Sequence, residues 1–155
     1  MRVGQGFDVH AFTDDPERPL ILGGVTIPGR GLAGHSDADV AAHAVADALL
    51  GAAGLGDIGR HFPDTDPQWE GASSLDLLAV VVGMLASAGW AVENVDLTLI
   101  LEVPMLAPHV PAMESKMAGV LAAPISVKAK RAEGLGAIGR REGIACLAVA
   151  LLRPR

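Results

Sequence analysis

Short apolar stretches, bounded by turn residues, recur along the chain between longer apolar stretches of helical length. The short ones alternate apolar with other residues or run apolar for a few positions, which predicts strands. These strands are residues 3–7 (with 8–10 as a continuation), 20–22, 25–27, 95–101, 125–129 and 144–152. Gly23 and Gly24 separate two of them, as in a two-residue hairpin turn.

Three longer stretches predict helices. Ser36 is the predicted N-cap of the first, with Asp37 and Asp39 in its first turn and an end near Gly51 and Gly54. The others are residues 74–88, capped by the serines at 73 or 74, and about 110–121. Strands and helices interleave without a repeat or linker. We therefore expect an α/β (α+β) class, with residues 1–155 forming one domain whose single mixed sheet is covered by helices on one face.

Composition narrows the class of protein. Hydrophobic residues make up 50% of the 155 positions and the formal net charge is −6, which disfavours nucleic acid as a partner. Cys146 is the only cysteine and lies in an apolar run, so we expect a buried thiol, no intrachain disulfide and a reducing cytoplasm. The apolar residues 77–92 fall short of the ~20 needed to span a membrane, so a buried helix is expected.

Asp8, His10 and His43 are the candidate metal ligands. Residues two apart in a strand project from the same face, so Asp8 and His10 can converge on one ion. His43, on the first predicted helix and two turns from its start, can approach from a second element. One carboxylate and two imidazoles, with a fourth position open, is typical of catalytic Zn²⁺, for which Mn²⁺ or Co²⁺ can substitute. Asp47, one helical turn further, either orients His43 or is a solvated carboxylate.

Several long motifs stand in order along the chain. They are GQGFDVH at 4–10, HSDADV at 35–40, GDIGRHFPDTD at 56–66, NVD at 94–96, PHVP at 108–111 and GRREGIAC at 139–146. Together they resemble the 2-C-methyl-D-erythritol 2,4-cyclodiphosphate synthase family over essentially the whole chain. The resemblance implies a ferredoxin-like-type sandwich that assembles as a homotrimer, and a lyase of non-mevalonate isoprenoid biosynthesis. That enzyme converts 4-diphosphocytidyl-2-C-methyl-D-erythritol 2-phosphate to the cyclodiphosphate and CMP.

The resemblance also implies roles for individual residues. It implies that Asp8, His10 and His43 hold the zinc-type ion and that Glu133 binds Mg²⁺ (or Mn²⁺) together with the substrate diphosphate. His35 and Arg131 fall at the expected catalytic positions, and His35 with Ser36 at the grip on the 2-phosphate. The expected substrate contacts are Asp8, His10, His35, Ser36, Asp57, Gly59, Phe62, Asp64, Asp66, Leu101, Lys130, Glu133, Ala137 and Arg140. An N-cap role for Ser36 is compatible with anion binding there.

Three departures from the family pattern concern the nucleotide half. Lys130-Arg131-Ala132 replaces a threonine-rich run, so these two cations either hold the diphosphate, alter nucleotide preference, or form an exposed basic strand end. The segment around Pro104 lacks a lysine often found in the cytosine pocket. Ala137 replaces an aromatic residue beside a central trimer cavity that is associated with isoprenoid diphosphates, and Arg140 matches its phosphate-binding arginine or pairs with Glu142.

Two other functions stay open from the sequence. One is a divergent paralogue with altered nucleotide preference, and the other is a non-catalytic trimer that binds isoprenoid diphosphates. In addition, residues 74–88 carry few polar side chains on any helical face. One buried stripe needs fewer apolar positions than that, so we expect the outer face of this helix to meet a partner or another trimer.

Overall fold

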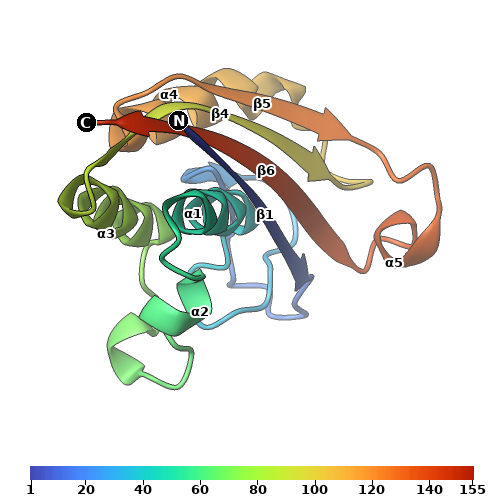
Figure 1. Cartoon of the computed structure of the whole chain (residues 1–155). Coiled ribbons are helices and arrows are strands. Elements are labelled where there is room, and N and C mark those ends of the chain that lie inside the picture. The colour runs from blue at the N-terminus through green and yellow to red at the C-terminus, as the bar shows by residue number, and fades with distance from the viewer.

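A four-stranded mixed sheet organises the chain in the computed structural model, which describes residues 1–155 (Figure 1). Its strands are β1 (Arg2–Ala11), β4 (Trp90–Ile100), β5 (Ile125–Lys130) and β6 (Gly143–Pro154), in the spatial order β1-β6-β4-β5. β4 and β5 run parallel, whereas β6 is antiparallel to both of its neighbours. The expected mixed sheet is therefore confirmed, and β1 and β5 form its two edges.

Three helices cover one face of this sheet. They are α1 (Val40–Ala53), α3 (Ser74–Ser87) and α4 (Val110–Leu121), and they pack on β1, β4 and β5 (Figure 1). The smaller elements are the hairpin β2 (Leu20–Leu22) and β3 (Val25–Ile27), the short helices α2 (Ile58–His61) and α5 (Gly136–Gly139), and the 3-10 turns η1 (Pro67–Trp69) and η2 (Ala107–His109). This two-layer arrangement confirms the expected α+β sandwich.

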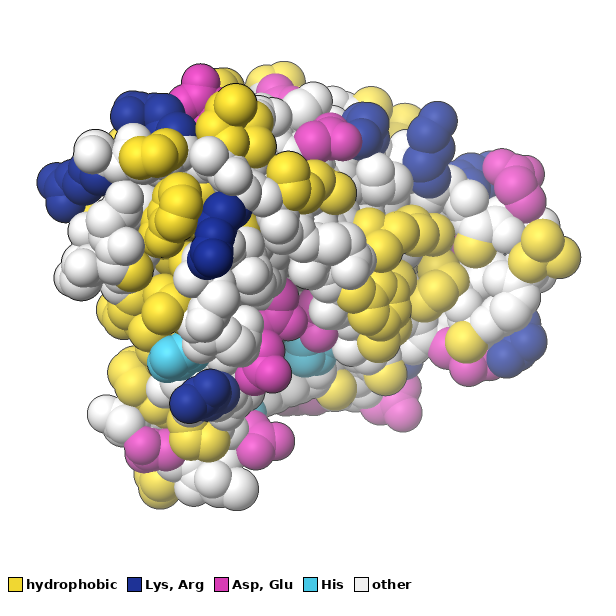
Figure 2. Space-filling model, viewed as in Figure 1, with side chains coloured by type: hydrophobic (Ala, Val, Ile, Leu, Met, Phe, Trp, Pro, Cys, Tyr) yellow, Lys and Arg dark blue, Asp and Glu magenta, His cyan; other side chains and the backbone are white.

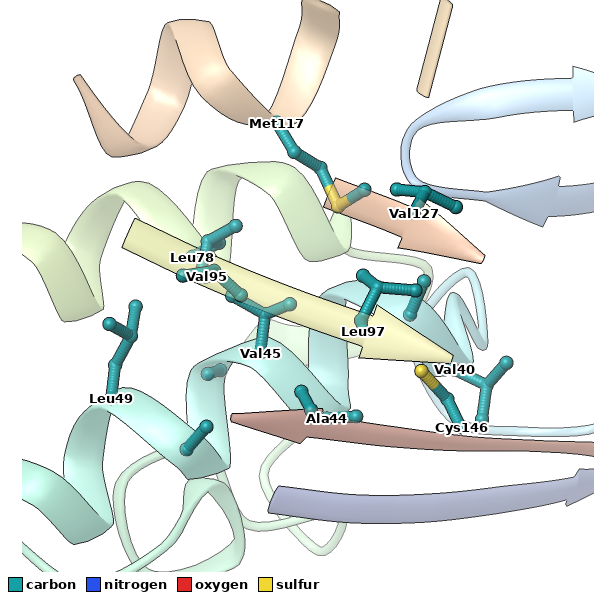
Figure 3. Packing of buried hydrophobic residues seen from close by; sticks show 14 of the residues in the cluster. Val40, Ala44, Val45, Leu49, Leu78, Val95, Leu97, Met117, Val127 and Cys146 are labelled. Carbon is teal, nitrogen blue, oxygen red and sulfur yellow. The ribbon is translucent and has the colours of Figure 1, made fainter. Parts of the chain in front are cut away.

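The core lies between the helices and the covered face of the sheet (Figure 3). One cluster of 33 buried residues includes Val45 of α1, Leu78 of α3, Met117 of α4 and Leu97 of β4. Cys146 of β6 is also fully buried within it, as expected. Because alternate residues of a strand point to opposite faces, the same strands present their remaining side chains to the open face.

The open face of the sheet is apolar near β1 and β6. Val3, Phe7 and Val9 of β1 are 68%, 52% and 49% exposed, and Leu147 and Val149 of β6 are 41% and 46% exposed. Figure 2 shows hydrophobic side chains gathered over these strands. A contiguous exposed apolar patch on a sheet is typical of a protein interface.

The start of α1 corrects the sequence prediction. Asp39, and not Ser36, is the N-cap, because its carboxylate accepts hydrogen bonds from the N–H groups of Ala41 and Ala42. Ser36 lies in the preceding loop, where its hydroxyl accepts from Ala38 N–H. Ala38 has a φ of 56°, which breaks helical geometry before Asp39. His43 therefore lies in the first turn of α1, and Ser36 is not at a helix N-terminus.

Most other boundaries agree with the sequence prediction, but β4 begins at Trp90 and not at residue 95, and it ends at Ile100, before Leu101. Ser73 caps α3 and α4 spans the expected residues, whereas the two long connections each contain a short helix, α2 and α5. No helix in the structure has both the length and the apolar character required to cross a membrane.

Candidate metal centre and adjoining cavity

Two glycines of β1 set the position of the candidate centre. Gly4 and Gly6 lie on the same face of β1 as Asp8 and His10, and both are buried against α1. A β-carbon at Gly6 would lie 2.0 Å from the carbonyl oxygen of Ala44, and one at Gly4 would lie 2.0 Å from that of Ala48. Because no side chain intervenes, α1 rests directly on the strand, and its first turn brings His43 beside Asp8.

Three ligand atoms from β1 and α1 converge on one point. Asp8 Oδ2 lies 3.0 Å from His10 Nε2 and 3.1 Å from His43 Nδ1, and these two nitrogens are 3.3 Å apart. A tetrahedral ion with ligand bonds of about 2.05 Å places its ligand atoms about 3.3 Å from one another. The donor atoms therefore already have nearly the spacing of a shared divalent cation, and the group expected from the sequence is brought together.

The surroundings of Asp8 and His10 set the hydrogen-bond and charge state of the candidate centre. His10 Nδ1 donates to the Ala33 carbonyl at 2.7 Å, so in the neutral ring Nε2 carries a free lone pair. Burial alone would raise the pKa of Asp8, but hydrogen bonds and charge from His10 and His43 outweigh it and hold that pKa well below its usual range. Burial lowers the pKa of His10, yet the Asp8 carboxylate reverses this and leaves it raised.

A cavity of about 420 Å³ opens directly onto these ligands. Its volume is within the range of small-molecule sites. Its lining includes Asp8, His10, His35, Ser36, His43, Gly59, Phe62 and Asp64 from the sequence prediction, together with Ile58, Trp69, Ser74 and Leu77. The rings of Phe62 and Trp69 meet edge to face, with centroids 5.1 Å apart. Polar groups at the metal centre thus face an apolar, aromatic wall.

Asp57 and Asp66 hold the wall of this cavity without lining it. The Asp57 carboxylate caps α2 by accepting from Arg60 N–H at 3.0 Å. The Asp66 carboxylate caps η1, and its backbone carbonyl accepts a hydrogen bond from His35 Nε2 at 3.2 Å. His35 therefore ties the loop before α1 to the loop after α2.

A second cavity, of about 460 Å³, lies at the other edge of the sheet. Leu101, Lys130 and Arg131 line it, as do Pro104 and Glu102. Arg131 donates from Nε and Nη2 to Glu102 Oε2 at 3.1 and 3.0 Å, and Gly134 N–H donates to Glu102 Oε1 at 3.2 Å. Glu102 therefore fixes Arg131 and the following loop at the rim of this cavity.

The remaining predicted residues line neither cavity. Glu133, with a φ of 53°, is exposed in the loop after β5, and Ala137 is exposed in α5. Arg140 donates from Nε to Glu142 at 2.6 Å, which is the pairing that the sequence left open. These three residues lie outside the metal centre of a single chain.

Some residues of the site were not singled out from the sequence. Trp69 lines the cavity, and its position in a chain with only 3% aromatic residues was a usable signal. Ser74 was considered only as a helix cap, yet its hydroxyl lies 2.9 Å from His43 Nε2. Asp47 was expected either to orient His43 or to be a solvated carboxylate. Instead its carboxylate accepts from Ile58 N–H at 2.8 Å and thereby anchors α2.

The mixed sheet, the Asp-His-His centre and the cavity beside it define an α+β protein with a candidate metal site that opens onto a cavity of small-molecule size. The YgbB family model matches residues 1–153. The 2-C-methyl-D-erythritol 2,4-cyclodiphosphate synthase of Symbiobacterium thermophilum is 57% identical over 159 residues, which covers 100% of both chains. That of Bordetella petrii is 58% identical over 155 residues, covering 97% of this chain and 94% of its own.

A solved structure agrees with these sequence matches. The IspF of Plasmodium falciparum in complex with CDP has a TM-score of 0.86 and 35% identity, and the match covers 99% of this chain and 96% of that one. The chain therefore belongs to the YgbB family of 2-C-methyl-D-erythritol 2,4-cyclodiphosphate synthases.

Proposed function

We propose that this protein is a cyclodiphosphate synthase of non-mevalonate isoprenoid biosynthesis, classed as a phosphorus–oxygen lyase. Its substrate is 4-diphosphocytidyl-2-C-methyl-D-erythritol 2-phosphate. An oxygen of the 2-phosphate forms a bond to the β-phosphorus, the bond from that phosphorus to the bridging oxygen breaks, and CMP leaves with the electron pair. The observation that carries this proposal is the convergence of Asp8, His10 and His43 at the wall of a cavity of small-molecule size.

The residues of the chain act by positioning the two phosphate groups. His35 and Ser36 hold the 2-phosphate, and the cavity residues Gly59, Phe62 and Asp64 enclose the methylerythritol portion. Asp57 and Asp66 support that wall through the caps and hydrogen bonds described above. Holding both reacting groups at contact distance lowers the entropic part of the barrier, so no protein nucleophile is needed.

The donor set supports zinc at the metal centre, with Mn²⁺ or Co²⁺ as substitutes. A divalent cation bound by Asp8, His10 and His43 supplies Lewis-acid polarisation of a phosphate oxygen. We assign a second cation, Mg²⁺ or Mn²⁺, to Glu133 and the substrate diphosphate. The exposed carboxylate of Glu133 is available for such a shared ion.

A homotrimer is part of the proposal. The first cavity belongs to the β1 edge of the sheet and the second to the β5 edge, with β6 and β4 between them. Within one chain the candidate metal centre is therefore far across the sheet from Leu101, Lys130 and Arg131. We assign these three residues to binding of the cytidine diphosphate portion of the substrate. We propose that copies pack through the exposed side chains of β1 and β6, with the β5 edge of one copy completing the site at the β1 edge of the next.

Release of CMP from the diphosphocytidyl substrate, with magnesium present, tests the function. We expect turnover by the protein as it stands and a loss of at least about 100-fold in His43→Ala, because an ion bound by the remaining two ligands is held far more weakly. His109→Ala is the matched control, since His109 lines neither cavity and is not one of the candidate metal ligands. Absence of turnover despite bound metal would overturn the proposal and favour a paralogue with another nucleotide or a non-catalytic binding trimer.

A further inference from the structure

His43 has a second nitrogen, which faces away from the candidate ion into a buried polar pocket. Its Nε2 lies 2.9 Å from Ser74 Oγ and 3.2 Å from Ser36 Oγ. Ser74 is 1% exposed and His43 9% exposed, so both side chains are held in place by their protein neighbours. The two hydroxyl groups therefore decide which nitrogen of His43 carries the hydrogen.

The hydrogen of the Ser74 hydroxyl is already committed to Asp37. Asp37 Oδ2 accepts from Ser74 N–H at 3.0 Å, and Asp37 Oδ1 accepts from Ser74 Oγ. An ionised carboxylate can only accept hydrogen bonds, so the single hydroxyl hydrogen of Ser74 points to Asp37. The Ser74 oxygen then faces His43 with a lone pair. A hydrogen bond between Ser74 Oγ and His43 Nε2 therefore forms only if Nε2 carries the hydrogen.

We propose that Asp37 and Ser74 are positioning residues that fix His43 in its Nε2–H tautomer. The lone pair of Nδ1 then faces Asp8 Oδ2 and His10 Nε2. His10 is fixed in the complementary way, because its Nδ1 donates to the Ala33 carbonyl. When both rings are neutral, Asp8 Oδ2, His10 Nε2 and His43 Nδ1 therefore present lone pairs to one point, where a divalent cation can bind all three. The inference rests on the proposed metal centre and adds the residues that orient one of its ligands.

The hydrogen bonds from Asp37 through Ser74 to His43 also affect the hydroxyl of Ser36. Because His43 Nε2 donates, it does not accept from Ser36, and the Ser36 hydroxyl accepts from Ala38 N–H at 3.2 Å. Its own hydrogen can turn either toward Ser74 Oγ, 3.5 Å away, or toward the cavity that Ser36 lines. A hydroxyl with a free hydrogen beside a cation site is suited to donate to a phosphate oxygen.

Metal affinity of the purified full chain tests the inference without reference to turnover. Zinc affinity is measured by competition with a chromophoric chelator, and the visible spectrum of the Co²⁺ form reports the ligand geometry. We expect Ser74→Ala to bind zinc about 10- to 100-fold more weakly, the usual effect of removing a group that orients a metal ligand. Ser74→Thr keeps the hydroxyl and is expected to restore most of that affinity.

Ser73→Ala is the matched control. Ser73 is the adjacent N-cap of α3 and its hydroxyl accepts from Asp76 N–H at 3.4 Å, with no contact to His43. It is expected to lower the melting temperature of the metal-free protein but to leave zinc affinity unchanged. Asp37→Asn is a second test, because an amide has one acceptor atom and cannot accept from the N–H and the hydroxyl of Ser74 at separate oxygens. We expect it to weaken zinc binding as well.

The outcomes separate this inference from the proposed function. Wild-type zinc affinity in both Ser74→Ala and Asp37→Asn overturns the inference and leaves the proposed function standing. An equal loss of affinity in Ser73→Ala also overturns it, because the effect would then come from the stability of α3. If the unaltered protein binds no divalent metal, the proposed function and this inference fall together.

Discussion

Gly6 of β1 lies directly against the carbonyl oxygen of Ala44 in α1, where a β-carbon would come within 2.0 Å of that oxygen. The contact is with backbone, so it cannot be relieved by rotating a side chain. We predict that Gly6→Ala forces α1 away from β1 and destabilises the protein by about 3 kcal/mol, as overpacking of a core does. Because the same displacement separates His43 from Asp8, zinc affinity should fall too. Chemical denaturation and the chelator competition measure both effects.

Gly83→Ala is the control for that substitution. Gly83 lies in the middle of α3, and an added β-carbon there meets nothing within 4 Å. Alanine in a helix interior is favoured over glycine by about 0.5–1 kcal/mol. We expect a gain of that size with unchanged zinc affinity, and a similar loss of stability in both variants would contradict the packing argument.

Asp39 joins α1 to the β2–β3 hairpin. Its fully buried carboxylate accepts from Gly23, Gly24, Ala41 and Ala42 N–H groups. We predict that Asp39→Ala destabilises the fold by about 3 kcal/mol, because it removes a helix cap and leaves buried N–H donors without a partner. Asp39→Asn retains one acceptor oxygen and should lose clearly less, as measured by urea unfolding. Equal losses would show that the helix cap, which asparagine can keep, contributes little and would contradict this prediction.

The sequence predicted the metal centre because its geometry is local. Asp8 and His10 share a face of any strand, and only the approach of α1 had to be supplied by the fold. The start of α1 was predicted wrongly, because Ser36 and Asp39 are both good caps by residue type. The choice between them depends on the hairpin N–H groups at Gly23 and Gly24, which reach Asp39 from a distant part of the chain.

The other half of the site shows a different limit of sequence reasoning. Leu101, Lys130 and Arg131 do come together at the β5 edge, but Glu133, Ala137 and Arg140 line neither of the two cavities. In the proposed trimer these residues would act across contacts between copies, and the apolar pattern of one chain reports only the burial within that chain. Their roles were accessible through the family resemblance alone and stay predictions.

Cys146 is predicted to be unreactive in the native protein. Its thiol is buried in β6, and burial followed by the nearby Asp39 and Asp8 charges raises its pKa far above the ordinary value. Since the thiolate is the reactive species, a chromogenic disulfide reagent at pH 8 should label no thiol until the protein unfolds. Labelling in urea then gives one thiol per chain. Rapid labelling without denaturant would contradict the packing of β6 against α1.

Phe7 and Leu147 are cross-strand partners on the open face of the sheet, 52% and 41% exposed. If copies pack through this face, Phe7→Glu places a charge in an apolar interface and should shift the proposed trimer to the monomer mass in multi-angle light scattering. Val80→Glu on α3, where Val80 is 48% exposed, is the matched control and should leave a trimer. Loss of species larger than a trimer in this control would support the expected partner contact of α3.

Protons and a metal ion compete for His10 Nε2, which gives the metal affinity a defined pH dependence. The pKa of His10 is raised in the metal-free protein, chiefly by Asp8 acting against the effect of burial. The ion pair between His10 and Asp8 therefore stabilises the metal-free fold. Its contribution is fully present below about pH 6.5, the pKa of a histidine in the unfolded chain. It is lost as the pH rises through the raised pKa of His10 in the folded protein. Zinc requires the unprotonated ring, so its affinity changes in the opposite sense.

We predict that zinc affinity falls by about tenfold for each pH unit below the folded pKa of His10, since one proton must be displaced. The increase in melting temperature caused by a fixed excess of zinc should shrink accordingly between about pH 8 and pH 6, because that increase follows the logarithm of the affinity. His109→Ala, which removes a histidine outside the centre, should show the same profile. A zinc-induced shift of equal size across this range would mean that His10 does not bind the ion through Nε2.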